Sequence, residues 1–251
     1  MILGIENLFG RRKVQRLYDT LKSQPFELNR FFEDAIAVTN IDLRYDQTQL
    51  DRIPATGPLA MVANHPFGVI DGTILCHLAA QARGDFRILI NAVLCRDKEL
   101  APHLLPVDFS PGKAALKNNV AMGRRAREAM ADDIPVLIFP SGFVSTAGKF
   151  GTGRAVDAPW TTFAAKLISD ARANVVPIFF HGQNSRAFHI ASHLSESLRM
   201  AFLIREARAR FGTRFDVTIG DTLAYESLEE IKGRKALTHY LYDAVQQLDE
   251  A

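Results

Sequence analysis

The segment at residues 64–72, Asn-His-Pro-Phe-Gly-Val-Ile-Asp-Gly, carries the side chains of this sequence that are best suited to proton transfer. It follows an apolar run and precedes a helix-like stretch, so His65 would stand at the end of a strand, where ligands meet α/β sheets. Asp71 would lie in the first turn of the next helix. A carboxylate there can hold one imidazole nitrogen and leave the other to take a proton from a substrate hydroxyl. Because Pro, Gly and Asp-Gly also favour turns, these residues alone leave catalysis and an ordinary connecting loop equally open.

Two further segments also follow apolar runs. Residues 139–145, Phe-Pro-Ser-Gly-Phe-Val-Ser, contain a turn whose backbone N–H groups could receive an anion or a developing oxyanion. Residues 175–185 show only a strand that runs into a polar loop. The sequence has no Gly-x-Ser-x-Gly nucleophile elbow and no Gly-Lys-Ser/Thr phosphate loop. His189 and His193 lack a surrounding zinc motif, so we expect both to be structural and expect no metal site.

The elements that would position these segments alternate along the chain. Apolar, β-rich runs lie at 59–63, 86–91, 135–139, 174–180 and 215–219, and helix-like stretches lie at about 71–83, 112–131, 159–173, 195–211 and 228–249. This alternation predicts an α/β fold with a mostly parallel central sheet flanked by helices. Pro177 lies inside the fourth run, so we expect it at a sheet edge or a strand end.

Composition places the chain among ordinary globular proteins. Of 251 residues, 47% are hydrophobic and 23% are charged, which excludes disordered and fibrous classes. We predict one α/β domain over residues 46–251, preceded by a helical segment over residues 1–45. The apolar residues 2–9 and the basic residues 11–16 of that segment suit a helix on the membrane surface and a helix packed on the domain equally well. No apolar run approaches the roughly 20 residues that span a bilayer.

Charge and cysteine content narrow the functional classes. Thirty Lys and Arg residues against 28 Asp and Glu residues give a net charge of +2, which is too even for a nucleic-acid-binding protein. Basic residues gather at 113–127 and at 199–214, where they could form a solvated helix face or receive an anionic lipid, a phosphorylated cofactor or an acidic carrier protein. Cys76 and Cys95 lie in apolar stretches, so we expect buried thiols in a reducing cytoplasm.

Taken in this order, the three segments resemble the blocks of the phospholipid/glycerol acyltransferase family, the lysophospholipid acyltransferases. The segment NHPFGVIDG resembles the first block, IFPSGFVS the third, which is usually FPEGTRS, and VVPIFF the fourth. The likeness is closest to the hemolysin-like or ornithine-lipid-type branch, which carries NHPxGxxDG, and it spans residues 50–225. Five residues separate His65 from Asp71, where the main family has four, and this branch shares the extra residue.

The resemblance implies an O-acyltransferase without a cofactor. It would move a fatty acyl chain from acyl-CoA or acyl carrier protein to the hydroxyl of a lyso-lipid, such as a lysophospholipid or lyso-ornithine lipid, without an acyl-enzyme. His65 would be the general base and Asp71 its orienting partner. Substrate binding would involve Asn64, Gly68, Arg96, Pro140, Ser141, Gly142 and Ser145. Such an enzyme would be cytoplasmic and peripheral on the inner face of the cell membrane, with no nucleic-acid partner.

One departure from the family concerns the acceptor. The arginine of FPEGTRS is Val144 here, so Lys149, Arg154 or Arg186 would have to supply a charge for a phosphate, or the acceptor is not a simple glycerol phosphate. Two other interpretations use the same residues. One is an acyl thioesterase in which water replaces the lipid hydroxyl at His65. The other is a non-catalytic protein that binds lipid surfaces through its basic clusters.

Overall fold

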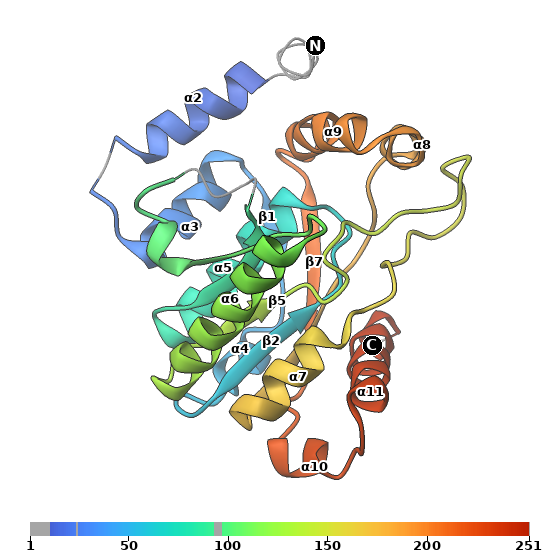
Figure 1. Cartoon of the computed structure of the whole chain (residues 1–251). Helices are drawn as coiled ribbons and strands as arrows, with labels where there is room; N and C mark the ends of the chain where they lie inside the picture. The colour runs from blue at the N-terminus through green and yellow to red at the C-terminus, as the bar shows by residue number, and fades with distance from the viewer. Residues whose placement is uncertain (1–10, 24, 93–96, 251) are drawn as a thin grey trace.

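The computed structural model describes residues 11–23, 25–92 and 97–250, and a seven-stranded sheet runs through it. The strands are β1 (Asp42–Arg44), β2 (Leu59–Ala63), β3 (Arg87–Asn91), β4 (Leu104–Val107), β5 (Val136–Ile138), β6 (Asn174–Phe180) and β7 (Arg214–Ile219). Their order across the sheet is β1-β7-β6-β2-β5-β3-β4. The five strands from β6 to β4 are parallel, whereas β7 is antiparallel to β6 and parallel to β1. The expected α/β fold with a mostly parallel sheet is confirmed (Figure 1).

Helices cover both faces of this sheet (Figure 1). They are α2 (Arg11–Leu21), α3 (Leu28–Val38), α4 (Gln47–Asp51), α5 (Val69–Arg83), α6 (Lys113–Ala131), α7 (Thr162–Ala171), α8 (Arg186–Leu194), α9 (Glu196–Ala209), α10 (Tyr225–Glu229) and α11 (Arg234–Gln246), with 3-10 turns η2 (Ala101–His103) and η3 (Gln247–Asp249). Helices α3 and α5 pack on one face, and α6, α7 and α11 pack on the other. In the described part of the chain, no helix is both long and apolar enough to traverse a bilayer.

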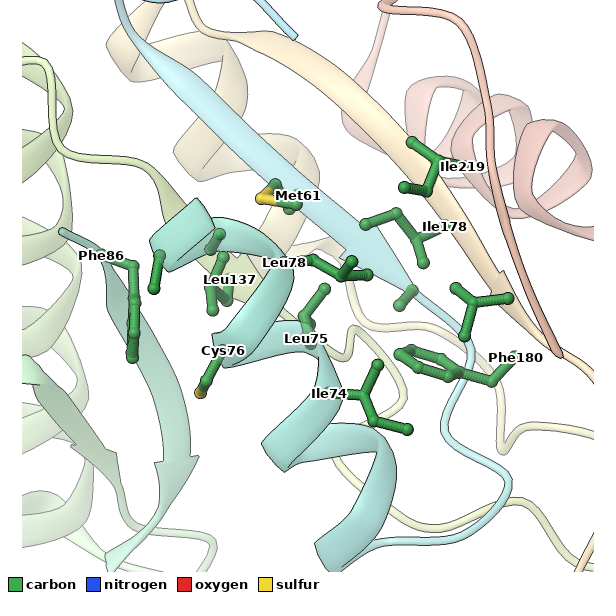
Figure 2. Packing of buried hydrophobic residues seen from close by; sticks show 14 of the residues in the cluster. Met61, Ile74, Leu75, Cys76, Leu78, Phe86, Leu137, Ile178, Phe180 and Ile219 are labelled. Carbon is green, nitrogen blue, oxygen red and sulfur yellow. The ribbon is translucent and has the colours of Figure 1, made fainter. Parts of the chain in front are cut away.

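Strand β2 is the central element that positions the functional segment. All five of its residues are buried, because successive side chains alternate between the two helical layers. Met61 points into the layer of α5, where it packs with Leu75 and Leu78 (Figure 2), whereas Ala60 and Val62 face the opposite layer. A strand held from both sides fixes the position of the chain that leaves its carboxyl end, at residue 64.

The two edge strands were absent from the sequence prediction. Strand β1 lies within the segment expected to be helical, and it adds a strand to the sheet by pairing with β7, so the expectation of helix alone is wrong there. Residues 1–10 lie outside the described residues. Strands β1 and β4 are three and four residues long, β1 is largely polar and β4 contains Pro106, so neither has an unbroken apolar run. Helix α8 was also missed.

The expectation for Pro177 is wrong as well. Pro177 lies in the middle of β6, an interior strand, and is in register with Val62 of β2. On its other side the ladder with β7 has ended at Ile219, and the Pro177 carbonyl accepts a hydrogen bond from Gly220 N at 2.9 Å. The missing N–H of the proline therefore falls at an interruption of the ladder, where an interior proline is tolerated.

Candidate active site

The carboxyl ends of β2 and β5 bring the predicted segments at 64–72 and 139–145 together. The two strands are adjacent and parallel, with Val62 in register with Ile138. The chains that leave them remain in contact, because Ser145 N donates a hydrogen bond of 2.8 Å to the carbonyl of His65. Both segments follow strands, as the sequence predicted, and because these strands are parallel the two segments lie at the same edge of the sheet.

His65 and Asp71 form the predicted pair. His65 Nδ1 lies 3.1 Å from Asp71 Oδ1, in an orientation that is not aligned for a good hydrogen bond, and Nδ1 has no better partner among the described residues. The Asp71 side chain is fully buried in the first turn of α5. Its Oδ2 accepts from Phe67 N at 2.8 Å and its Oδ1 from Gly72 N at 2.9 Å. Two backbone donors at the start of the helix therefore hold the carboxylate in a fixed orientation next to the imidazole.

The His65 ring is held by packing as well as by charge. It stacks on Phe139 with ring centroids 3.9 Å apart and an interplanar angle of 24°. The side chain is 17% exposed, and because Nδ1 is buried, the exposed part lies elsewhere on the ring. Nε2 is therefore the nitrogen left to meet a substrate.

Asn64 and Gly68 have clear structural roles at this edge. The Asn64 amide donates to the carbonyl of Phe180 at 3.0 Å and accepts from Phe180 N at 2.7 Å, so it ties the end of β2 to β6. Gly68 has a φ of +87°, and a Cβ atom there would lie 2.9 Å from Leu203 Cδ2 and 3.1 Å from Val144 Cγ2. Only glycine fits this turn without strain and without displacing its neighbours. A role of either residue in substrate binding stays a prediction.

The turn that follows Pro140 differs from its expected role. Gly142 N donates to Phe139 O at 2.9 Å, and Phe143 N donates to the Ser141 hydroxyl at 3.3 Å. These two amides are therefore used inside the turn and do not offer themselves to an anion, contrary to the sequence prediction. The Ser141 hydroxyl in turn donates to Phe143 O at 2.7 Å, which closes the turn on itself.

Asp157 is a site residue that the sequence did not indicate. Its Oδ1 accepts hydrogen bonds from His65 N at 3.2 Å and from the Ser145 hydroxyl, and its Oδ2 accepts from Trp160 Nε1 at 2.9 Å. It also lines a polar cavity of about 130 Å³, together with Asn64, Pro66, Ser145, Arg154, Ala155, Val156, Phe179, Gly182, Gln183, Gln246 and Asp249. A single Asp in an irregular loop gave no pattern by which to find it.

Of the cations proposed from sequence, Arg154 lines the polar cavity that Ser145 and Asn64 also line. Arg154 is paired with Asp249 at 2.6 Å, and Arg186 donates to Phe150 O at 2.8 Å. A further cation, Arg199 of α9, donates to Val144 O of the turn; the sequence indicated it only as a member of the basic cluster at 199–214. Lys149 is exposed. Arg96, like Cys95, lies outside the described residues, and Cys76 is buried as expected.

Three further histidines, His103, His189 and His193, are held by protein groups of their own. His103 Nδ1 lies 2.9 Å from Asp85 Oδ1, but these residues precede β4 and β3, so this second His–Asp pair occupies the opposite edge of the sheet. His189 Nδ1 accepts from Ala147 N at 3.3 Å, and His193 Nε2 lies 2.8 Å from Ala147 O. Both rings are tied to the backbone, as expected for structural histidines.

Comparison with known proteins gives three findings. A family model described as acyltransferase matches residues 21–237. Two curated relatives are each named lyso-glycine lipid O-acyltransferase: one from Phocaeicola vulgatus is 25% identical over 88% of this chain and 83% of its own length, and one from Bacteroides thetaiotaomicron is 27% identical over 83% and 76%. The crystal structure of the 1-acyl-sn-glycerophosphate acyltransferase PlsC from Thermotoga maritima matches with a TM-score of 0.60 and 15% identity, over 99% of this chain and 86% of that one. This last likeness shows a shared fold.

Proposed function

Since this chain belongs to the acyltransferase family, it is an enzyme that transfers acyl groups, and we propose that it acylates the hydroxyl of a lyso-lipid with an acyl thioester as the donor. The observation that carries the proposal is the His65–Asp71 pair, at the carboxyl edge of a parallel sheet, with the carboxylate fully buried. The names of the two curated relatives support a lipid hydroxyl as the acceptor.

The proposed reaction is a direct transfer. His65 Nε2 removes the proton of the acceptor hydroxyl while the hydroxyl oxygen attacks the thioester carbonyl carbon. The tetrahedral intermediate then expels the thiolate as the C–S bond breaks, and the imidazolium returns its proton to that sulfur. An ester and a free thiol result, and no protein atom becomes acylated. Asp71 stabilises the imidazolium that forms between the two steps. It also favours the tautomer with the proton on Nδ1, which leaves Nε2 free to act as the base.

For the acceptor, we propose a lyso-lipid with an amino-acid headgroup. The relatives are named for lyso-glycine lipid, and the sequence resembles a branch of the ornithine-lipid type. Val144 stands where the family's phosphate-binding arginine is expected, which weighs against a simple glycerol phosphate. Acyl-CoA and acyl carrier protein are both suitable donors for the mechanism, and no cofactor is needed for it.

We propose further that the enzyme works at the inner surface of the cell membrane, from the cytoplasmic side. Leu116 and Val120 of α6 are each 65% exposed, and Lys113 and Lys117 lie on the same side of the helix. Exposed apolar side chains flanked by cations suit an anionic lipid surface. Replacing Leu116 and Val120 with Gln should weaken co-sedimentation with anionic vesicles. Unchanged co-sedimentation would show that another surface, or none, binds the lipid.

The test of the proposed function is mass spectrometry of lipids after the purified chain is mixed with a donor and an acceptor. The donors are acyl-CoA and acyl carrier protein, and the acceptors are lyso-glycine lipid, lyso-ornithine lipid and lysophosphatidic acid. We expect a diacyl product that requires an acceptor. Free fatty acid released without dependence on acceptor would establish a thioesterase instead. No turnover of any donor would favour a non-catalytic lipid-binding protein.

A further inference from the structure

Arg199 of α9 is a half-buried cation that forms no ion pair with any carboxylate of the described residues. Its guanidinium donates to the carbonyl of Val144 through Nη2, with the Thr146 hydroxyl at 3.5 Å from the same nitrogen. The acidic influence on it comes from Glu196, about one turn earlier on the same helix. Nε and Nη1 make no hydrogen bond within the described part of the chain, so three of its five N–H donors are available.

The guanidinium binds the turn that contacts the catalytic segment. Val144, its main partner, belongs to the turn that contacts His65 and lies against Gly68 of the catalytic segment. Leu203, one helical turn along α9, contacts the same glycine. The guanidinium carbon also lies 5.6 Å from the ring centroid of Phe143, an exposed side chain beside the turn.

Burial makes this charge costly. Burial lowers the pKa of Arg199, because the guanidinium loses contact with water. The charge of Glu196 raises this pKa, but by less. Arginine nevertheless remains protonated in proteins. A carbonyl and an aromatic face offset only part of the cost of a buried charge, whereas an anion would offset much more of it.

The other arginines of this region are not equivalent. Arg205 is paired with Glu206 at 2.8 Å. Arg210 donates to the carbonyl of Gln183 and lies over the ring of Phe67. Arg208 is exposed, so it provides a matched control on the same helix.

We propose that Arg199 binds an anionic oxygen group of a substrate, a carboxylate or a phosphate, beside the turn at 141–146. The inference rests on the proposed function, because it assigns the cation that holds a substrate near His65. The anion is either the headgroup of the acceptor or a phosphate of coenzyme A. In both cases the anion would bind to the Arg199 side chain of α9 and not to Gly142 N or Phe143 N. These two amides are already bonded within the turn.

The test measures binding without turnover, by isothermal titration of the full chain. One pair of probes is N-decanoylglycine and its uncharged methyl ester, which carry no hydroxyl to acylate. The other pair is coenzyme A and pantetheine, which lacks the phosphates. The proteins compared are the wild type, Arg199→Gln, Arg199→Lys and Arg208→Gln, each checked for a normal thermal unfolding transition.

We expect Arg199→Gln to weaken binding of one anionic probe by about 10- to 100-fold and to leave its uncharged counterpart unchanged. The affected pair identifies the acceptor or the donor as the source of the anion. Arg199→Lys should restore part of the affinity, and Arg208→Gln should have no effect. Equal weakening of charged and uncharged probes would reduce Arg199 to a structural role. No effect on either anion, or no binding of either by the wild type, would also overturn the inference. A wild type that binds the anions through Arg199 but transfers no acyl group would refute the proposed function alone.

Discussion

Replacing Asp71 with Asn tests whether the buried carboxylate sets the state of the catalytic imidazole. The carboxylate accepts from two backbone donors, Phe67 N on one oxygen and Gly72 N on the other, and the His65 ring lies 3.1 Å from the second oxygen. Asparagine offers one oxygen and one NH₂ group in nearly the same volume. If its oxygen stays on the side of His65, the NH₂ group faces Phe67 N, and a buried donor loses its acceptor at a cost of about 1–3 kcal/mol in the free energy of unfolding.

The opposite orientation of the amide has a catalytic consequence. An NH₂ group facing His65 would require Nδ1 to accept, which moves the ring proton to Nε2 and removes the base. Either orientation also removes the negative charge that stabilises the imidazolium. We therefore expect kcat/KM for acyl transfer to fall by about 10²- to 10⁴-fold.

The chain supplies a matched control in Asp85→Asn. Asp85 also accepts from a backbone N–H, that of Phe86 at 2.7 Å, and from a histidine, His103 Nδ1 at 2.9 Å, but it lies at the opposite edge of the sheet. Transfer rates and urea unfolding would be measured for both variants. Asp85→Asn should keep the wild-type rate. A rate for Asp71→Asn within about tenfold of wild type, or an equal loss in both variants, would refute the assigned role.

Three other predictions concern stability and the support of the site. Gly68→Ala should destabilise the protein to urea more than Gly57→Ala does, because both have a φ of +87° but only Gly68 has side chains in the way of a Cβ atom; equal losses would leave backbone strain as the whole cause. Asp157→Ala should change the emission of Trp160, the only tryptophan, and lower the transfer rate, since it frees the indole and the His65 backbone together; an unaltered spectrum would contradict the hydrogen bond. Burial lowers the pKa of His189 below its ordinary 6.5, so the unfolded chain binds more protons, and the free energy of unfolding should fall as the pH drops through that value. His189→Gln should reduce this acid sensitivity in urea titrations. An unchanged pH dependence would argue against a role of His189.

The sequence predicted the parts of the fold that have strong periodic or local patterns. Strand β2 is an unbroken apolar run and β6 a longer one that contains Pro177, and both were located correctly. The edge strands were missed because they bury little surface and need no such run. Pro177 was misplaced because a break in the ladder depends on where β7 ends, which is a property of the assembled sheet.

The same division holds for the site. His65 and Asp71 belong to one contiguous segment, so their proximity follows from a strand, a short turn and a helix start. Asp157 and Arg199 come from an irregular loop and a distant helix, and only the folded chain brings them to residues 65 and 144. The sequence does not show whether the Ser141 hydroxyl faces a ligand or the turn itself. In the structure this hydroxyl accepts from Phe143 N, so that amide, which the sequence left available, is already bonded.

The most direct test of the central claim compares His65→Gln with His103→Gln in the lipid transfer assay. The two histidines each stand beside an aspartate, at 3.1 Å and 2.9 Å, but at opposite edges of the sheet. We expect the diacyl product to fall by about 10²- to 10⁴-fold in His65→Gln and to remain at the wild-type level in His103→Gln. Diacyl product formed by His65→Gln at a rate close to that of the wild type would contradict the account.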